Sequence, residues 1–173
     1  AATWYRCDLI DTPHELDGTA DLVYTGRGAI IWMQDLTPWA AVIARLLKPG
    51  GYFHVLDNHP LLYLFDDNSK ELRWSGQDYL DGGGYSQGWP SEYIGEIGTP
   101  IEEQAKSHER GWPIATVFNA LTAAGLDVEY IGEHREGYWS EKSYLPDGIR
   151  EAIPLTFSVL ARKPTYVGPT AVR

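Results

Sequence analysis

The sequence predicts an α/β fold built on a mixed sheet, in which the last strand runs antiparallel to its neighbours. A short apolar run at 20–25, an amphipathic helix at 37–47 and a strand-like run at 52–56 have the lengths of a right-handed crossover, which makes the two strands parallel. The chain closes on strand-like segments at 127–133 and 155–162, joined by about twenty irregular residues. A parallel neighbour would need a dozen or more structured residues in between, so this short connection predicts an antiparallel pair.

The first elements follow from local composition. Residues 2–7 are compatible with a strand that ends at Asp8, ahead of residues 11–13 (Asp-Thr-Pro), which are typical of a helix start. The run 20–25 (Ala-Asp-Leu-Val-Tyr-Thr) stands between glycine-containing turns, as a buried parallel strand does. We therefore expect two strands in the first 25 residues.

The helix that follows has clear start and stop signals. Thr37 is the expected N-cap, and Pro38 takes the first helical position. Apolar residues recur at spacings of three and four, at Trp39, Val42, Ile43, Leu46 and Leu47. The segment 48–51 (Lys-Pro-Gly-Gly) ends the helix. Further on, Pro113 opens a second amphipathic helix for which Gly125 is the expected carboxyl-terminal cap.

Between these units lies an irregular, aromatic-rich segment at 61–111. An insertion of this length is usually a lid or a binding loop, and the alternative is a small satellite core beneath a long loop. We interpret residues 1–164 as one domain that contains this insertion, followed by a loose tail at 165–173.

Composition narrows the classes of function. The formal net charge of −10 repels a phosphate backbone, so nucleic acid is not expected as a partner. No apolar run reaches the roughly 18 residues of a membrane span, and the first residues lack the pattern of a secretory signal. A single cysteine, Cys7, suits a reducing compartment. We therefore expect a soluble cytoplasmic protein without a membrane partner.

Several stretches resemble the class I S-adenosylmethionine-dependent methyltransferases, in particular the branch that acts on small molecules. The stretches, which cover most of 2–60 and 112–164, are Asp21 to Gly26 (DLVYTG), Trp32 to Leu36 (WMQDL), Ala44 to Gly51 (ARLLKPGG), Phe118 to Glu129 and Leu155 to Pro164. The resemblance implies a Rossmann-like methyltransferase fold in which DLVYT is the fourth strand. It also implies S-adenosylmethionine as cofactor and a small-molecule acceptor.

The resemblance also assigns residues to the cofactor. Asp8 would end the third strand and accept a hydrogen bond from the adenine amino group, with Leu9 beside the ring. The loop with Thr25, Gly26 and Gly28 would line the site, and Trp32 would cover the methionine end. Without the resemblance, these residues are equally compatible with ordinary turns, and Trp32 with the core.

The family's glycine-rich cofactor loop has no counterpart here and is expected upstream of residue 1. We therefore interpret the chain as roughly the carboxyl-terminal two-thirds of such an enzyme. A central strand would then become a free edge around 22–24, and such edges pair with other chains. The hypothesis is that the chain alone binds cofactor poorly and self-associates.

His59 is the candidate catalytic residue. It follows a strand that ends in the same layer as the cofactor loop, and an imidazole can accept a proton from a hydroxyl or amine at neutral pH. Asp57 could orient it. Methyl transfer needs mainly alignment, so a structural role for His59 is the stronger alternative. A metal site is disfavoured because His54 points away from the strand face that carries Asp57.

The substrate side of the site is assigned to aromatic and histidine residues in and after the insertion. They are Tyr85, Trp89, His108 and Tyr138. Two other function classes stay open. A nicotinamide-dependent oxidoreductase would require a parallel last strand and a crossover helix, whereas a non-enzymatic binding or scaffold module would require neither.

Overall fold

The computed structural model describes residues 2–66, 71–88, 95, 97–137 and 145–165. Its main sheet has four strands in the order β1-β2-β6-β5, namely β1 (Ala20–Gly26), β2 (Leu47–Asn58), β6 (Thr156–Arg162) and β5 (Asp127–His134). β1 and β2 are parallel, and β6 is antiparallel to both β2 and β5. The predicted α/β class, the mixed sheet and the antiparallel last strand are confirmed.

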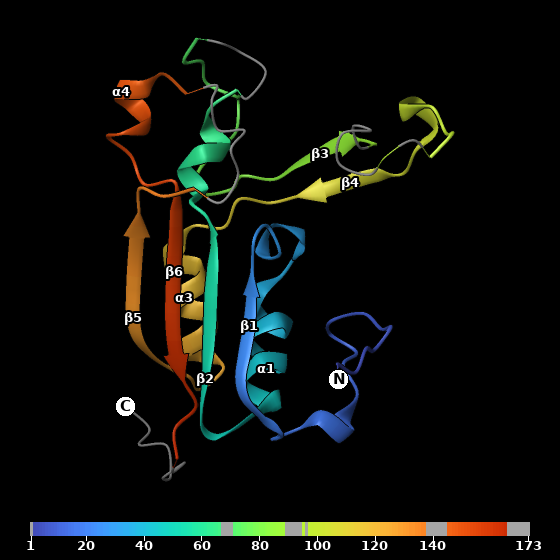
Figure 1. The fold of residues 1–173 in the computed structure, drawn as a ribbon, viewed down its shortest axis with the longest axis vertical. Coiled ribbons are helices and arrows are strands. Elements are labelled where there is room, and N and C mark those ends of the chain that lie inside the picture. Colours follow the sequence, from blue (N-terminus) through green and yellow to red (C-terminus); the bar gives the residue numbers. More distant parts are fainter. Residues whose placement is uncertain (1, 67–70, 89–94, 96, 138–144, 166–173) are drawn as a thin grey trace.

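Two helices lie on one face of this sheet. α1 (Leu36–Leu46) connects β1 to β2, and α3 (Ile114–Ala123) precedes β5; Figure 1 shows both behind the strands. From 51 to 57, every second residue of β2 is buried, and Phe53 and Val55 among them point to these helices. With the inward residues of α1, α3 and β6 they make the main hydrophobic core.

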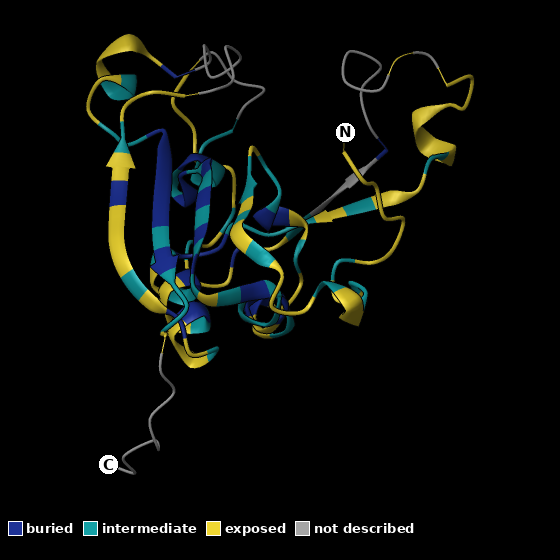
Figure 2. Cartoon of the chain, turned by 60° about the horizontal axis from the view of Figure 1, so that its bottom comes forward, coloured by how far each residue is buried: buried dark blue, intermediate teal, exposed yellow. Residues whose placement is uncertain are grey.

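The opposite face of the sheet is not covered by any described element. It carries the alternate residues of the strands, and Figure 2 shows strand segments of this sheet in the exposed colour. Leu22 and Tyr24 of β1 are 60% and 52% exposed, and Tyr130 of β5 is 56% exposed. Among the described residues β1 pairs only with β2, so the expected free edge around 22–24 is present.

The amino-terminal strand predicted at 2–7 is wrong. These residues form no regular structure, and the segment lies beside α1 rather than against the sheet (Figure 1). A strand needs a neighbour to bond with, and the segment has none there. Instead Arg45 of α1 holds the following turn, because its guanidinium donates to the Thr12 carbonyl at 2.7 Å and pairs with Asp17 beside η1 (His14–Leu16).

Both predicted helices are present, with two differences at the ends of α1. The helix ends at Leu46, and Leu47, predicted to lie in it, begins β2. The N-cap of α1 is Asp35, whose carboxylate accepts from the Thr37 backbone N–H at 2.8 Å, so the assignment of the cap to Thr37 is wrong. At the end of α3, Gly125 has φ +83° and donates to the Thr122 carbonyl, while Leu126 donates to Leu121. This is a Schellman cap, as predicted.

The insertion holds short elements that extend away from the strand ends. They are η3 (Pro60–Leu64), β3 (Gly84–Gln87), η4 (Ile101–Glu103) and β4 (Lys106–Glu109). β3 and β4 form an antiparallel hairpin that projects sideways beyond β1 in Figure 1. A second apolar cluster joins Leu62 of η3 to Leu145 and Leu155, on either side of α4 (Asp147–Arg150). One part of the insertion is therefore a satellite core.

None of the helices in the described ranges is long and apolar enough to cross a membrane. The tail predicted to be loose lies, beyond residue 165, outside the described residues.

Candidate functional site

The candidate site lies where the parallel strands β1 and β2 end. Carboxyl ends of parallel strands meet at one edge of a sheet, which is where open α/β sheets bind ligands. The chain leaves β1 through Arg27 and Gly28, whose φ angles of +61° and +91° are in the left-handed region, and enters η2 (Ile30–Trp32). A Cβ added to Gly28 would meet no atom within 4 Å, so the loop faces open space at that point.

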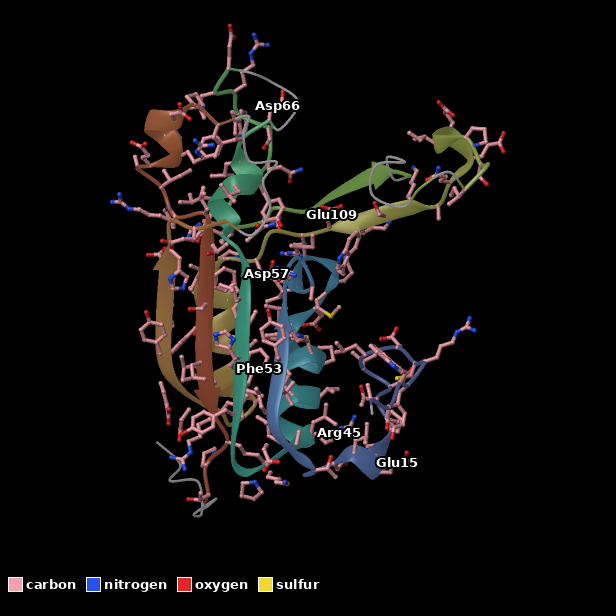
Figure 3. All side chains as sticks on the ribbon, in the orientation of Figure 1. Glu15, Arg45, Phe53, Asp57, Asp66 and Glu109 are labelled. Atoms are coloured by element: carbon pink, nitrogen blue, oxygen red, sulfur yellow. The ribbon has the colours of Figure 1, made fainter. Side chains whose placement is uncertain are left out.

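Asp57 of β2 holds this loop in place. Its side chain is fully buried, and its carboxylate accepts from the backbone N–H groups of Gly28 at 2.8 Å, Ile30 at 3.2 Å and Asn58 at 2.7 Å. Figure 3 shows Asp57 at the upper end of β2, beside the loop that follows β1. These charge-assisted bonds offset the free-energy cost of burying a carboxylate.

The other loop residues have different surroundings. The Thr25 hydroxyl is buried and has no hydrogen-bond partner among the described residues. Its register partner is the fully buried Val55, so the Thr25 side chain points to the helix-covered face. Gly26 packs tightly, because a Cβ there would lie 2.4 Å from the Leu56 carbonyl oxygen. Only glycine fits at this position.

Both ring nitrogens of His59 are engaged. Nδ1 accepts from the Leu61 N–H at 3.2 Å as the N-cap of η3, and Nε2 lies 2.8 Å from a carboxylate oxygen of Glu133. The ring is buried and packs edge-on against Phe157. Burial lowers the pKa of His59 below its ordinary value, and the hydrogen bond and charge of Glu133 oppose this shift. The geometry suits a structural histidine; general-base catalysis stays a hypothesis.

The hairpin of the insertion is fastened to η2. The Arg110 backbone N–H donates to the Ile31 carbonyl at 2.9 Å, and the buried Trp112 donates from its indole to the Met33 carbonyl at 3.0 Å. The Arg110 guanidinium lies 4.3 Å from the centre of the Trp112 ring. Two residues that follow β4, Arg110 and Trp112, are thus hydrogen-bonded to η2 and to Met33, which follow the loop after β1.

The predicted cofactor residues fall into two groups. Thr25, Gly26, Gly28 and Trp32 lie together at the end of β1, where Trp32 is 39% exposed. Asp8 and Leu9 belong to the segment beside α1. There the Asp8 carboxylate accepts from Ile10 N–H in a local turn, and Leu9 packs against the main core. Among the described residues, no hydrogen bond or ring contact joins this pair to the loop after β1.

The predicted substrate residues are only partly described. His108 is exposed on β4 and stands opposite Tyr85 in the hairpin register. The Tyr85 side chain, Trp89 and Tyr138 lie outside what the structure describes. Among the described residues no three His, Cys, Asp or Glu side chains are grouped to hold a metal ion.

Sequence reasoning missed three residues that shape this site. They are Asp57 as the anchor of the loop, and Arg110 and Trp112 as the base of the hairpin. A signal for Asp57 was available, because alternation along β2 places it on the same face as Phe53 and Val55. A carboxylate on a buried face needs donors nearby. No local pattern marks the other two, since their partners are 79 residues away in sequence.

No protein-family model matches the sequence, and no curated protein matches it. Solved structures do. An S-adenosylmethionine-dependent methyltransferase from Mesorhizobium loti aligns with 93% of this chain and 69% of its own, at a TM-score of 0.59 and 21% identity. A candidate methyltransferase of the same kind from Listeria monocytogenes aligns over 93% and 68%, at 0.61 and 15%.

A third methyltransferase structure, from Methanosarcina mazei, aligns with 87% of this chain and 62% of its own, at a TM-score of 0.50 and 15% identity. The chain thus spans about two-thirds of the length of these proteins. At such identities the likeness concerns the fold. The chain has the Rossmann-like α/β fold of S-adenosylmethionine-dependent methyltransferases, over about nine-tenths of its length.

Proposed function

We propose that this chain is the carboxyl-terminal part of an enzyme that transfers a methyl group from S-adenosylmethionine to O, N or C of a small molecule. The observation that carries the proposal is the sheet order β1-β2-β6-β5. In this order the last strand, β6, lies between β2 and β5 and runs antiparallel to both. The loop after β1 stands at the ligand-binding edge of that sheet.

The fit of the cofactor to these residues is partial. The loop offers open space beside Gly28 and an exposed indole at Trp32, whereas the Thr25 side chain points to the helix-covered face. The described residues contain no Gly-x-Gly-x-Gly loop for the amino-acid end of the cofactor, and Asp8 and Leu9 make no hydrogen bond or ring contact with the loop after β1. The proposed activity is therefore that of the whole protein, of which this chain supplies one side of the site.

In this proposal the loop lines the cofactor side and the β3–β4 hairpin lines the acceptor side. The proposed acceptor contacts are His108 on β4 and three residues whose side chains lie outside the described residues, namely Tyr85, Trp89 and Tyr138. A nicotinamide-dependent oxidoreductase is disfavoured by the antiparallel β6. The loop amides of Gly28 and Ile30 are also taken by Asp57, so they are not available to a pyrophosphate.

The test uses the protein as its gene encodes it, including any residues before Ala1. Radiolabelled S-adenosylmethionine is incubated with the protein and a small-molecule extract, and label transfer is measured. Transfer is expected, with Trp32→Leu weakening cofactor binding several-fold. The matched control is Trp74→Leu, which changes an exposed tryptophan of the insertion. Absence of transfer, with no cofactor binding by calorimetry, would refute the proposal.

The 173-residue chain provides a second measurement. We expect it to bind S-adenosylmethionine weakly, because the described residues form only one side of a cofactor site. Tight binding by a monomer of this chain, measured by calorimetry, would contradict that expectation. A reading frame upstream of Ala1 that lacks a Gly-x-Gly-x-Gly motif after a strand would favour the binding-module alternative.

A further inference from the structure

Asp57 connects the sheet to the loop after β1 through its buried carboxylate. The loop has two successive left-handed residues, Arg27 and Gly28, and left-handed backbone is unfavourable for a residue such as arginine. The loop is held at both ends. The Arg27 N–H donates to the Leu56 carbonyl at 3.0 Å, and Gly28 and Ile30 donate to Asp57. Two consecutive residues of β2 therefore set the path of the loop.

The loop in turn sets the position of η2. Ile30 and Ile31 are buried in the main core, and the backbone N–H of Ile30 is one of the donors to Asp57. The carbonyl of Ile31 accepts from Arg110, and that of Met33 accepts from Trp112. The chain of contacts from Asp57 to the base of the hairpin is thus continuous and short.

We infer that Asp57 is a positioning residue that fixes the loop at 27–30 and, through η2, the base of the β3–β4 hairpin. A change at one carboxylate then moves both sides of the site together. That these are the cofactor side and the acceptor side rests on the proposed function. The mechanical coupling rests only on the contacts given above.

The first test is Asp57→Asn in this chain, followed residue by residue with amide hydrogen exchange. The asparagine amide has one acceptor oxygen and two donors, so it cannot accept from Gly28, Ile30 and Asn58 as the carboxylate does. Exchange at Gly28 and Ile30 should become about tenfold faster or more. The Arg110 amide, whose acceptor is Ile31, should accelerate with them, while Val159 in the sheet stays protected.

The matched control is Asp35→Asn, which alters the carboxylate that caps α1. The asparagine keeps an oxygen that can accept from the Thr37 N–H, so exchange at Thr37, Gly28 and Arg110 should stay as in the wild type. Unchanged exchange at Arg110 in Asp57→Asn, with Gly28 and Ile30 accelerated, would overturn the coupling. Unchanged exchange at all three would overturn the positioning role itself.

A second variant covers the case in which Asp57→Asn does not fold. Gly28→Ala perturbs the loop without leaving a buried group unpaired, because its Cβ would enter open space and only the positive φ is strained. Gly125→Ala, with φ +83° and equally open surroundings, is the control at the end of α3. Faster exchange at Arg110 in the first variant and not in the second supports the coupling; equal rates oppose it.

Kinetics of the whole protein add a readout that separates positioning from general destabilisation. With Asp57→Asn, the KM values of S-adenosylmethionine and of the acceptor should both rise, by about tenfold. Asp35→Asn should leave both KM values unchanged. A rise in neither would contradict the role of Asp57 in the site. If the wild-type protein transfers no methyl group, the proposed function fails, while the exchange result still decides the coupling.

Discussion

The two faces of the main sheet differ more than any other two regions of this molecule. On one face, Phe53 and Val55 of β2 are fully buried beneath α1 and α3. On the other, the residues between them in sequence, such as Tyr52 and His54, are half-buried and no described element covers them. Parallel strands are normally buried on both faces. Among the described residues, the burial of this sheet is therefore one-sided.

Ring contacts on the uncovered face are made between strands. Tyr24 of β1 stacks on His54 of β2 with ring centres 5.8 Å apart, and the Arg162 guanidinium lies 5.4 Å from the centre of the Tyr52 ring. Such pairs contribute little each, roughly 0.5–1 kcal/mol at exposed sites. The covered face should therefore dominate stability, and the following experiments test that comparison.

The largest effect is expected from neighbouring substitutions in β2. Phe53→Ala removes a buried ring that packs edge-on against Trp39, and should lower the free energy of unfolding by about 3–5 kcal/mol. Tyr52→Ala, one residue away on the other face, should cost about 1 kcal/mol. Denaturant unfolding measures both. Equal losses would mean that the second face is buried in solution.

A smaller effect distinguishes two hydroxyls. The buried Thr156 donates to the Glu136 carbonyl at 2.8 Å, so Thr156→Val should lower the free energy of unfolding by about 1–2 kcal/mol. Thr25 has no partner among the described residues, so Thr25→Val should be neutral or slightly stabilising. A loss of stability in Thr25→Val comparable to that in Thr156→Val would show that the Thr25 hydroxyl is bonded in solution.

The pH dependence of unfolding tests the burial of His59 against Phe157. Because burial lowers the pKa of folded His59 below its ordinary value of 6.5, the unfolded chain binds the proton more readily than the folded chain. This contribution to stability is fully present above about pH 6.5 and is lost as the pH falls toward the folded pKa. His59→Gln should remove this part of the pH dependence, measured by denaturant unfolding across the acidic range.

An unchanged pH profile in His59→Gln would contradict that assignment. Glu133→Gln provides a separate check, since Glu133 raises the pKa of His59. Its removal should lower the pKa of folded His59 further, so the loss of stability should continue to lower pH and become larger. A pH profile unchanged by Glu133→Gln would mean that the pair does not exist in solution.

The smallest effect on stability is expected at the free edge of β1, where a substitution should mainly change self-association. Leu22→Lys places a charge on β1, and should change the free energy of unfolding by less than about 0.5 kcal/mol while reducing self-association. Leu80→Lys is the matched control, since Leu80 is 76% exposed in the insertion. Sedimentation at several concentrations measures both. Self-association that is equal in both variants and the wild type would exclude β1 as the contact.

Much of the fold could be predicted because its signals are local. Alternation and spacing of apolar residues located α1, α3 and the four strands of the main sheet, and connection length gave the antiparallel direction of β6. The predicted strand at 2–7 failed because strand propensity needs a pairing partner, and the described residues offer none. The cap of α1 was misplaced by two residues because aspartate and threonine are both good caps.

Fewer features of the candidate site than of the fold could be predicted from the sequence. Thr25, Gly26, Gly28 and Trp32 lie together because they follow one strand, and their role as cofactor contacts stays a prediction. Asp8 and Leu9 were assigned by resemblance alone, and the structure places their segment beside α1.

The amino-acid sequence was sufficient to predict the class of the fold, the direction of the main-sheet strands and the loop at the end of β1. These follow from periodicity, turn residues and connection lengths, which act over a few residues. Only the tertiary structure decided that Asp57 holds that loop, that His59 is bonded at both nitrogens and that Trp112 fastens the hairpin. Each of these depends on a partner brought close by the packing of the sheet, and no local pattern in the chain encodes such a distance.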